Sequence, residues 1–453
     1  LPPRHMDSLL QILDALESPA LGGSAGTVPA LARALGVCST PGCRAVLGEP
    51  PEPPPAPAAL PPEQWQLLKE LLLPDPAAPE RGAVLAPDGS TVALGPLLAG
   101  IEVGLRRGGS EGSWDPLPTL QPPVDPLFAV TIAEVLGTSF LLARGGDGDT
   151  TALGPGGCWD DVDDPQNYTL MGPPTPMPDA VANGAMDGVV LGARLAREPA
   201  PLAELLRGYY GTGNDSDTGR LPSSYRRRDF GALAGPERLE EELVAMLEVL
   251  RVLPPTRGLL EGVGPEEVSA VARRAAREFT RRYVECPGGG PRCMWGARPY
   301  RGTPSLRGGA LGSVYIHHTL EPGTPCGGGR ACARAMRSMQ RFHQDTGGGD
   351  DIGYSFVVGG GGYLYQGRGW HWVGAHTKGG GGKGFGVSYV GDFSATLPDP
   401  DTLALVRDEL LPCAVRAGGG GPNYTLHGHR QLVHTDCPGG GLFQEIQSWP
   451  GFQ

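Results

Sequence analysis

Histidine and cysteine near the C-terminus form the most promising chemical group in this chain. His429 and Cys437 stand eight positions apart, and two adjacent histidines, His317 and His318, lie far upstream at the end of an apolar run. Two imidazoles and one thiolate give Zn²⁺ three protein ligands and leave its fourth position open for water, which is the catalytic pattern. The alternative is a set of scattered surface histidines and one half of a disulfide, since no short Cys-x-x-Cys spacing supports a metal site.

The alternation of residue types before the two adjacent histidines chooses between them. In the strand expected over residues 313–317, Val314 and Ile316 fall on one face and His317 falls on the other, more polar face. By the same alternation His318 joins the apolar face as a core residue. His317 is therefore the better candidate ligand.

Length and charge limit the class of protein. A chain of 453 residues is too long for one ordinary hydrophobic core, so two domains are expected. Lysine and arginine total 37 against 49 aspartate and glutamate, and the formal charge of −12 argues against a nucleic-acid-binding protein. No apolar run of 18 residues occurs, so no membrane span is expected. The chain opens at Leu1 without a methionine or a signal sequence, which indicates a processed mature chain.

The cysteines and glycosylation sequons indicate an oxidising compartment. The chain has nine cysteines, so eight can pair if Cys437 binds metal. Cys326 and Cys332, and also Cys38 and Cys43, are close enough in sequence to close small loops. Three sequons occur, at Asn167, Asn214 and Asn423. Together these features favour a secreted, extracellular protein.

Residues 1–284 predict a mostly helical α+β domain. Apolar residues at helical spacing predict helices over residues 7–17, 64–73, 126–143, 179–197, 236–253 and 265–284. Residues 83–93 predict two short strands around a Pro-Asp-Gly turn. No catalytic constellation occurs in this part of the sequence, so its role stays open.

Residues 285–453 predict an α/β domain. Short strand-like runs separated by glycines alternate with two helical patterns: strands over residues 313–317, 354–358, 363–366 and 385–390, and helices over residues 330–346 and 401–417. This interleaving predicts a mixed sheet flanked by helices, with the candidate site on one edge or face.

Several stretches of this second part resemble the peptidoglycan recognition protein family, which is related to the phage-type zinc amidases. They are Trp295-Gly-Ala-Arg-Pro, Ile316-His-His-Thr, Asp351-Ile-Gly-Tyr-Ser-Phe, Val373-Gly-Ala-His-Thr, Gly428-His-Arg-Gln and Cys437-Pro-Gly. The first part also resembles the long secreted members of the family, which are N-acetylmuramoyl-L-alanine amidases. The stretches that carry this second likeness are Ala86-Pro-Asp-Gly-Ser-Thr-Val-Ala, Gly184-Ala-Met-Asp-Gly-Val and Tyr209-Tyr-Gly.

The resemblance implies a role for individual residues. The family's zinc ligands fall on His317, His429 and Cys437, its catalytic tyrosine falls on Tyr354, and a threonine near the scissile carbonyl falls on Thr435. The family's disulfides imply that Cys326 pairs with Cys332 and Cys286 with Cys413, leaving the pairing of four cysteines open: Cys38, Cys43, Cys158 and Cys293.

The resemblance also implies a substrate and a reaction. The expected activity is zinc-dependent hydrolysis of the amide between N-acetylmuramic acid and L-alanine in bacterial peptidoglycan, as part of innate immunity. Contacts to the glycopeptide are expected from His371, Trp372, His376 and Lys383. The alternative is a recognition protein that binds peptidoglycan without cutting it, and the presence of Cys437 favours the enzyme. A zinc peptidase acting on ordinary protein is a weaker alternative, because no His-Glu-x-x-His helix occurs.

Overall fold

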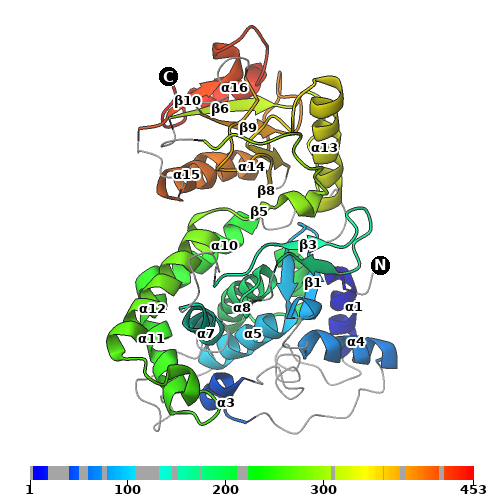
Figure 1. Cartoon of the computed structure of the whole chain (residues 1–453). Coiled ribbons are helices and arrows are strands. Elements are labelled where there is room, and N and C mark those ends of the chain that lie inside the picture. Colours follow the sequence, from blue (N-terminus) through cyan, green and yellow to red (C-terminus); the bar gives the residue numbers. More distant parts are fainter. Residues whose placement is uncertain are drawn as a thin grey trace.

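The computed structural model describes most of the chain, in twelve segments: residues 4–18, 40–49, 60–73, 79–108, 132–144, 152–172, 175–211, 223–307, 312–360, 362–377, 384–417 and 423–453. Within these segments the chain forms two lobes, one built from the first two thirds of the sequence and one from the last third (Figure 1). None of the helices in these segments combines the length and the apolar character that crossing a bilayer requires.

The first two thirds of the sequence form the lower lobe in Figure 1, and this lobe is mostly helical. Its helices are α1 (Met6–Leu16), α3 (Pro41–Leu47), α4 (Pro62–Leu72), α5 (Leu94–Gly108), α7 (Glu134–Ala143), α8 (Asp179–Arg197), α9 (Leu202–Tyr210), α10 (Ser223–Leu233), α11 (Pro236–Val252) and α12 (Pro265–Phe279). Two antiparallel pairs of short strands accompany them: β1 (Ala83–Leu85) with β2 (Thr91–Ala93), and β3 (Gly157–Trp159) with β4 (Tyr168–Leu170).

Helix α8 forms the centre of this lobe because small residues let it approach its neighbours closely. A Cβ atom added to Gly184 would lie 2.4 Å from the carbonyl oxygen of Ala93, and one added to Gly188 would lie 2.7 Å from that of Leu97. Thirteen of the 19 residues of α8 are buried, which accounts for its long apolar pattern in the sequence. The lobe is thus organised around a helix that is enclosed on most sides (Figure 1).

The upper lobe contains a six-stranded mixed sheet in the order β10–β6–β9–β7–β8–β5. Its strands are β5 (Gly289–Gly290), β6 (Ser313–His318), β7 (Phe356–Gly359), β8 (Tyr363–Gln366), β9 (Gly384–Tyr389) and β10 (Thr425–Gly428). Neighbouring strands run parallel except for β7 and β8, which are antiparallel. The mixed sheet with flanking helices, and the mostly helical first part with small sheets, confirm the predicted fold class.

Helices cover the two faces of this sheet unequally. Helix α13 (Gly329–Arg341) packs on one face, where its core partners include Val357 of β7 and Tyr365 of β8. Helices α14 (Pro400–Ala404), α15 (Leu411–Ala417) and α16 (Gly440–Ile446) enclose the other face with apolar residues of β6 and β9. His317 lies on the same face as α13, but on β6, which β9 separates from the strands under that helix.

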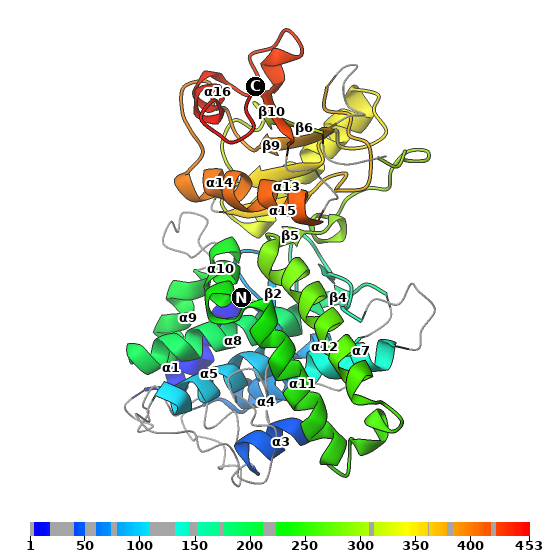
Figure 2. The same ribbon diagram turned by 90° about the vertical axis from the view of Figure 1, so that its left-hand side faces the viewer.

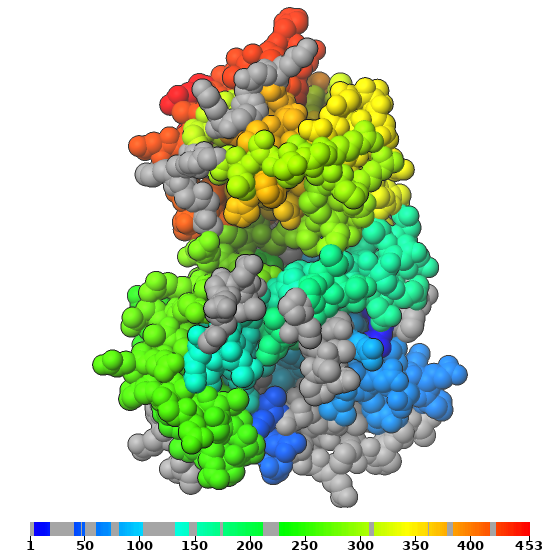
Figure 3. All heavy atoms as spheres, viewed as in Figure 1, coloured from blue at the N-terminus to red at the C-terminus, as the bar shows by residue number. Residues whose placement is uncertain are grey.

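A disulfide and surface ion pairs join the two lobes. Cys158 in β3 is bonded to Cys293 at the start of the upper lobe. Beyond β3, the Asp163 carboxylate lies 2.6 Å from Arg337 of α13, and Asp164 lies 3.2 Å from Arg330. Figure 2 places β5 at the junction of the lobes, and Figure 3 shows the segment around β3 and β4 reaching up against the upper lobe.

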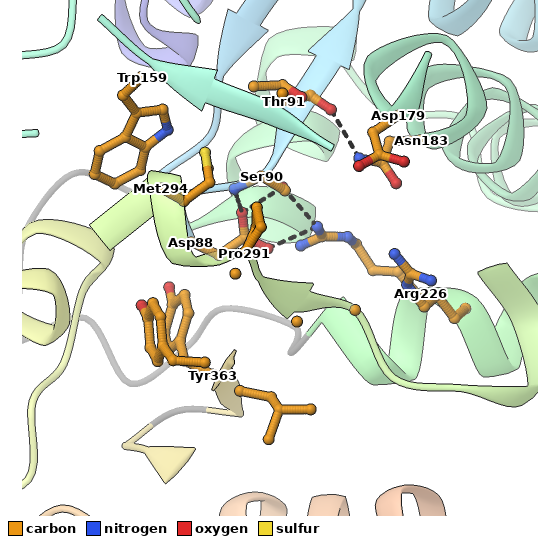
Figure 4. Close-up of a pocket in the computed structure, with 18 of the residues that line it drawn as sticks. Asp88, Ser90, Thr91, Trp159, Asp179, Asn183, Arg226, Pro291, Met294 and Tyr363 are labelled. Atoms are coloured by element: carbon orange, nitrogen blue, oxygen red, sulfur yellow. Dashed lines mark hydrogen bonds and ion pairs between the residues drawn. The ribbon is translucent and has the colours of Figure 1, made fainter. Parts of the chain in front are cut away.

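A buried polar cluster lies beside a cavity of about 100 Å³ between the lobes (Figure 4). Arg226 of α10 binds Asp88 at 2.6 Å and lies 3.8 Å from Asp187 of α8. The hydroxyls of Tyr209 and Tyr210 donate to the same Asp187 carboxylate, at 2.8 and 2.5 Å. Asp88, Asp187 and the two tyrosines come from the three stretches that resemble the long secreted family members, so these stretches, far apart in the sequence, meet in one cluster.

Candidate metal centre

Parallel pairing of β6 and β10 brings the two candidate histidine ligands together. Gly428 of β10 is in register with Ile316 of β6, so the residues that follow them, His429 and His317, lie side by side at the same ends of adjacent strands. Cys437 follows in the loop between β10 and α16, where the backbone N–H of Arg430 donates to its carbonyl oxygen at 2.8 Å. The sheet therefore sets the spacing of the histidines, and the loop folds back to add the sulfur.

These three side chains form a group able to hold a metal ion. One donor atom from each of His317, His429 and Cys437 lies within 4.8 Å of the others. The Cys437 Sγ lies 3.8 Å from His317 Nδ1, and the two imidazole centroids are 4.3 Å apart. His317 is buried, and His429 and Cys437 are partly exposed.

The donor atoms fit a zinc ion. His429 Nδ1 is buried and has no hydrogen-bond partner among the described residues, which is costly unless a ligand satisfies it. Burial, together with the neighbouring imidazoles, lowers the pKa of His317 far below its usual value, and burial lowers that of His429. Both rings are therefore neutral near pH 7 and have a lone pair available. Two such nitrogens with one sulfur form a donor set that zinc prefers.

Cys437 contributes a sulfur held by its neighbours. Burial raises the pKa of its thiol to about 11, while the backbone N–H of His318 and the charge of Arg430 oppose the rise. The His318 N–H lies 3.4 Å from the sulfur. The imidazole of His318 points elsewhere, since its Nδ1 accepts a hydrogen bond from Phe393 N at 3.2 Å in the core. The structure thus places His318 in the core, as its position on the apolar face predicts.

Tyr354 lies against the metal group. Its ring is 5.3 Å from that of His317 on one side and 5.5 Å from that of His343 on the other. Burial and the nearby Cys437 raise the pKa of Tyr354 to about 12, so the phenol is protonated near neutral pH and can donate a hydrogen bond. His343 Nδ1 accepts from the N–H of Gly353 at 2.9 Å and fixes the loop that carries the tyrosine.

Comparison with known proteins gives this arrangement a family context. The family described as "N-acetylmuramoyl-L-alanine amidase" matches residues 308–440. The curated N-acetylmuramoyl-L-alanine amidase of Mus musculus is 42% identical over 444 residues, covering 88% of this chain and 83% of its own length. That of Homo sapiens is also 42% identical, covering 87% of this chain and 80% of its own length. A solved human structure, "PGRP-IBETAC in complex with glycosamyl muramyl pentapeptide", is 34% identical over 37% of this chain and 99% of its own, with a TM-score of 0.35.

This chain belongs to the N-acetylmuramoyl-L-alanine amidase family. The relatives from mouse and man match both lobes, so membership extends beyond the sheet that carries the metal group. The resemblance to this family that the sequence motifs indicated is therefore confirmed.

Thr435 lies two residues before the cysteine of this amidase-family site. Its Oγ1 accepts a hydrogen bond from the Cys437 N–H at 3.2 Å, which holds the turn. A threonine hydroxyl that accepts one bond can still donate its own hydrogen. The side chain therefore holds this turn, and its hydroxyl keeps a hydrogen that it can donate.

The four residues expected to contact substrate occupy different environments. His371 and Trp372 are exposed, and the loop that carries them pairs with a neighbouring segment through the bridge Leu306–Trp372. His376 is buried, with Nδ1 lying 3.1 Å from Nε2 of His317. Lys383 lies outside the described residues. The contact between His376 and His317 has no signal in the sequence, because nothing local relates residues 59 positions apart.

The cysteines form the pairs implied by the family, and one more. Cys326–Cys332 and Cys286–Cys413 are both present, and Cys158–Cys293 joins the two lobes. Cys43 is also disulfide-bonded, whereas Cys38 lies outside the described residues. Cys437 is the free cysteine of the described part of the chain, which leaves its sulfur available to a metal ion.

Proposed function

We propose that this protein is a zinc-dependent hydrolase that cleaves the amide between the lactyl group of N-acetylmuramic acid and L-alanine in bacterial peptidoglycan. The single observation that carries the proposal is the group of His317, His429 and Cys437, with one unsatisfied histidine nitrogen, in a chain whose relatives are named as this amidase. In the reaction the carbonyl–nitrogen bond breaks, water supplies a hydroxyl group to the lactyl carbonyl, and alanine leaves as a free amine.

Each residue near the metal group has a chemical part in this proposal. His317, His429 and Cys437 would hold zinc, with the sulfur as a thiolate. The ion would supply a water of pKa near 7 and polarise the scissile carbonyl. Tyr354, protonated at neutral pH, would donate a hydrogen bond to the carbonyl oxygen as negative charge develops on it. The free hydroxyl hydrogen of Thr435 would supply a second donor.

The glycopeptide is proposed to bind along the loop after β8. His371 and Trp372 are exposed there and offer an imidazole and an aromatic face, groups that suit peptide carbonyls and sugar rings. The contacts expected from His376 and Lys383 stay predictions.

The proposed site of action is extracellular. The disulfides Cys158–Cys293, Cys286–Cys413 and Cys326–Cys332 need an oxidising compartment to form and persist. Two of the sequons, at Asn167 and Asn423, lie on exposed residues where a glycan can be attached, whereas Asn214 lies outside the described residues. A secreted enzyme with this specificity would act on bacterial wall fragments in innate immunity.

We propose residues 1–284 and 285–453 as separate domains. One large core extends through the lower lobe to Met294. Two smaller cores, which begin with Trp295 and Val314, belong to the upper lobe. The buried residues of these cores do not overlap, which supports separate folding units, and the partly buried Val162 packs against both the first core and the core that begins with Trp295. Residues 285–294 then form the junction, and the disulfide between Cys293 and Cys158 bonds this stretch to the lower lobe.

Metal analysis combined with a turnover assay on muramyl peptides tests the proposed activity. The wild type should contain about one zinc per chain and release the stem peptide. Cys437→Ser should lose both zinc and turnover, whereas His434→Ala, which alters an exposed histidine nearby, should keep both. A Cys437→Ser protein with full zinc and full turnover would overturn the ligand assignment. A wild type that binds peptidoglycan without turnover would establish the binding-only alternative.

A further inference from the structure

The buried imidazole of His376 lies directly behind the metal group. Its Nδ1 is 3.1 Å from His317 Nε2, while the other nitrogen of His317, Nδ1, faces the Cys437 sulfur at 3.8 Å. The ring of His317 therefore lies between a hydrogen-bond partner and the position of the ion. A neutral imidazole has one nitrogen that carries a hydrogen and one that carries a lone pair, so one nitrogen of His317 can donate a hydrogen bond while the other binds the ion.

A backbone carbonyl decides which nitrogen of His376 is protonated. His376 Nε2 lies 3.5 Å from the carbonyl oxygen of Gly384, which can only accept a hydrogen bond. The proton of a neutral His376 is thus placed on Nε2, and its Nδ1 accepts. Two donors reach that nitrogen: Nε2–H of His317 and the hydroxyl of Thr377 at 3.0 Å. With its proton on Nε2, His317 presents the lone pair of Nδ1 to the ion.

Two glycines hold the ring of His376 in this position. A Cβ atom added to Gly386 would lie 2.3 Å from Cγ of His376, and one added to Gly374 would lie 2.6 Å from its Cδ2. Gly386 belongs to β9 and is in register with Tyr315 of β6, so the sheet itself fixes the distance from this ring to His317. The imidazole therefore lies directly against backbone on two sides, which leaves it little freedom to turn.

We infer that His376 is a positioning residue of the metal centre, which fixes His317 in the tautomer that offers Nδ1 to the ion. This inference rests on the proposed zinc site and adds a function for a residue that substrate binding alone does not explain. A hydrogen-bonded partner behind a ligating histidine sets both the tautomer and the orientation of the ring, and its loss typically weakens metal binding about 10–100-fold.

Three substitutions separate this role from packing. His376→Asn keeps an acceptor, because its side-chain oxygen can occupy the place of Nδ1, whereas His376→Leu fills space without accepting and His376→Ala does neither. Zinc affinity is measured on the full chain by competition with a chromophoric chelator, and the visible spectrum of the Co²⁺-loaded protein reports the ligand set. His371→Ala, an exposed histidine of the same loop, is the matched control for zinc affinity.

The expected result is a loss of zinc affinity of about 10–100-fold in His376→Ala and His376→Leu, with a changed Co²⁺ spectrum, and a near-native affinity and spectrum in His376→Asn. Thermal unfolding of the metal-free proteins identifies any variant that fails to fold. If His376→Leu and His376→Ala bind zinc as tightly as the wild type and lose only substrate affinity, the positioning role is wrong while the proposed amidase stands. A wild type without zinc would overturn the proposed function itself.

Discussion

Tyr354 lies beside the metal group as a protonated donor. Its pKa of about 12, raised first by burial, keeps the hydroxyl hydrogen in place across the pH range in which the enzyme would work. Its ring contacts the rings of His317 and His343, but its hydroxyl is not among the three candidate ligand atoms. Its contribution is therefore separable from metal binding.

Tyr354→Phe should retain zinc but lose activity. Removal of one donor to a developing oxyanion typically lowers kcat about 10²–10³-fold, and the phenylalanine ring preserves the packing against the two imidazoles. Zinc content and steady-state kinetics on a muramyl peptide measure the two effects separately. Loss of zinc in this variant would show that the tyrosine supports the metal group and not the reaction, and unchanged kcat would remove it from the mechanism.

At the scale of secondary structure, the contact of α8 with the β2–α5 segment depends on two glycines. Gly184 and Gly188 face backbone carbonyls at distances that leave no space for a methyl group, whereas Gly208 on α9 has nothing within 4 Å of its hypothetical Cβ. The same substitution should thus have opposite effects in the two helices.

Gly184→Ala should lower the free energy of unfolding by about 1–3 kcal/mol, because an added methyl group would collide with the backbone of Ala93 in β2 and push α8 away from it. Gly208→Ala should raise it by about 0.5–1 kcal/mol, because alanine loses less backbone entropy in a helix than glycine does. Denaturant unfolding followed by circular dichroism measures both values. An alanine at residue 184 that leaves stability unchanged would contradict the close approach of the backbones.

The buried cluster around Arg226 makes a pH-dependent contribution to stability. Burial alone would raise the pKa of Asp88, but Arg226 and hydrogen bonds from Ser90 outweigh burial and lower it. For Asp187 burial is the larger effect, and its pKa is raised despite the same arginine. The ion pair with Asp88 therefore stabilises the fold above the ordinary carboxyl pKa of about 3.9 and loses this effect as pH falls through the lowered value.

Arg226→Met should destabilise the protein by about 3–5 kcal/mol at pH 7, because it leaves two buried carboxylates without a cation. In the variant, burial raises both carboxyl pKa values, so protonation at lower pH relieves the penalty and the difference from the wild type narrows. Denaturant unfolding at pH 7 and pH 5 checks this. Arg273→Met, which removes an exposed ion pair with Glu240, should change stability by less than about 1 kcal/mol at either pH. Equal losses at both pH values for Arg226→Met would contradict the account.

The periodicity of the sequence predicted several helices and strands, but the prediction missed helices α5 and α9 and also missed contacts that depend on the fold. Alternation along β6 assigned His317 and His318 to opposite faces because side chains of a strand alternate regardless of what surrounds it. Strand β10 was missed because Thr425–Gly428 is short, ends in glycine and lies at the edge of the sheet, where no continuous apolar run is needed.

Contacts between distant residues had no comparable signal. The pairing of His376 with His317 requires β9 beside β6, and the cluster around Arg226 requires α8, α10 and the β1–β2 turn to meet. The three metal-binding candidates were found because their residue types are chemically distinctive, whereas the sequence does not show which of its many arginines and tyrosines will be buried.

At the scale of the whole molecule, the buried cores of the two lobes have no residue in common, and a disulfide, two ion pairs and the partly buried Val162 connect the lobes. Zinc would bind only to the upper lobe, since all three candidate ligands belong to it. A ligand stabilises the unit that binds it, by about 4 kcal/mol at a free concentration 1,000 times its Kd.

Differential scanning calorimetry of the full chain should therefore show two transitions, of which zinc raises one. Addition of a chelator should lower the midpoint of that transition and leave the other in place. Cys437→Ser should behave like the chelated protein with and without added zinc. A single transition that shifts as a whole with zinc would show that the lobes unfold as one unit, contrary to the proposed division at residue 284.

The bond between Cys158 and Cys293 determines what a protease can release from this molecule. A backbone cut at any point between these two residues leaves the fragments attached to one another through sulfur. On a denaturing gel such a nicked chain should migrate as a single species of about 47.2 kDa until a thiol is added, and as two bands afterwards. In an oxidising extracellular fluid, cleavage between Cys158 and Cys293 would leave the fragment that carries His317 covalently bonded to the N-terminal fragment.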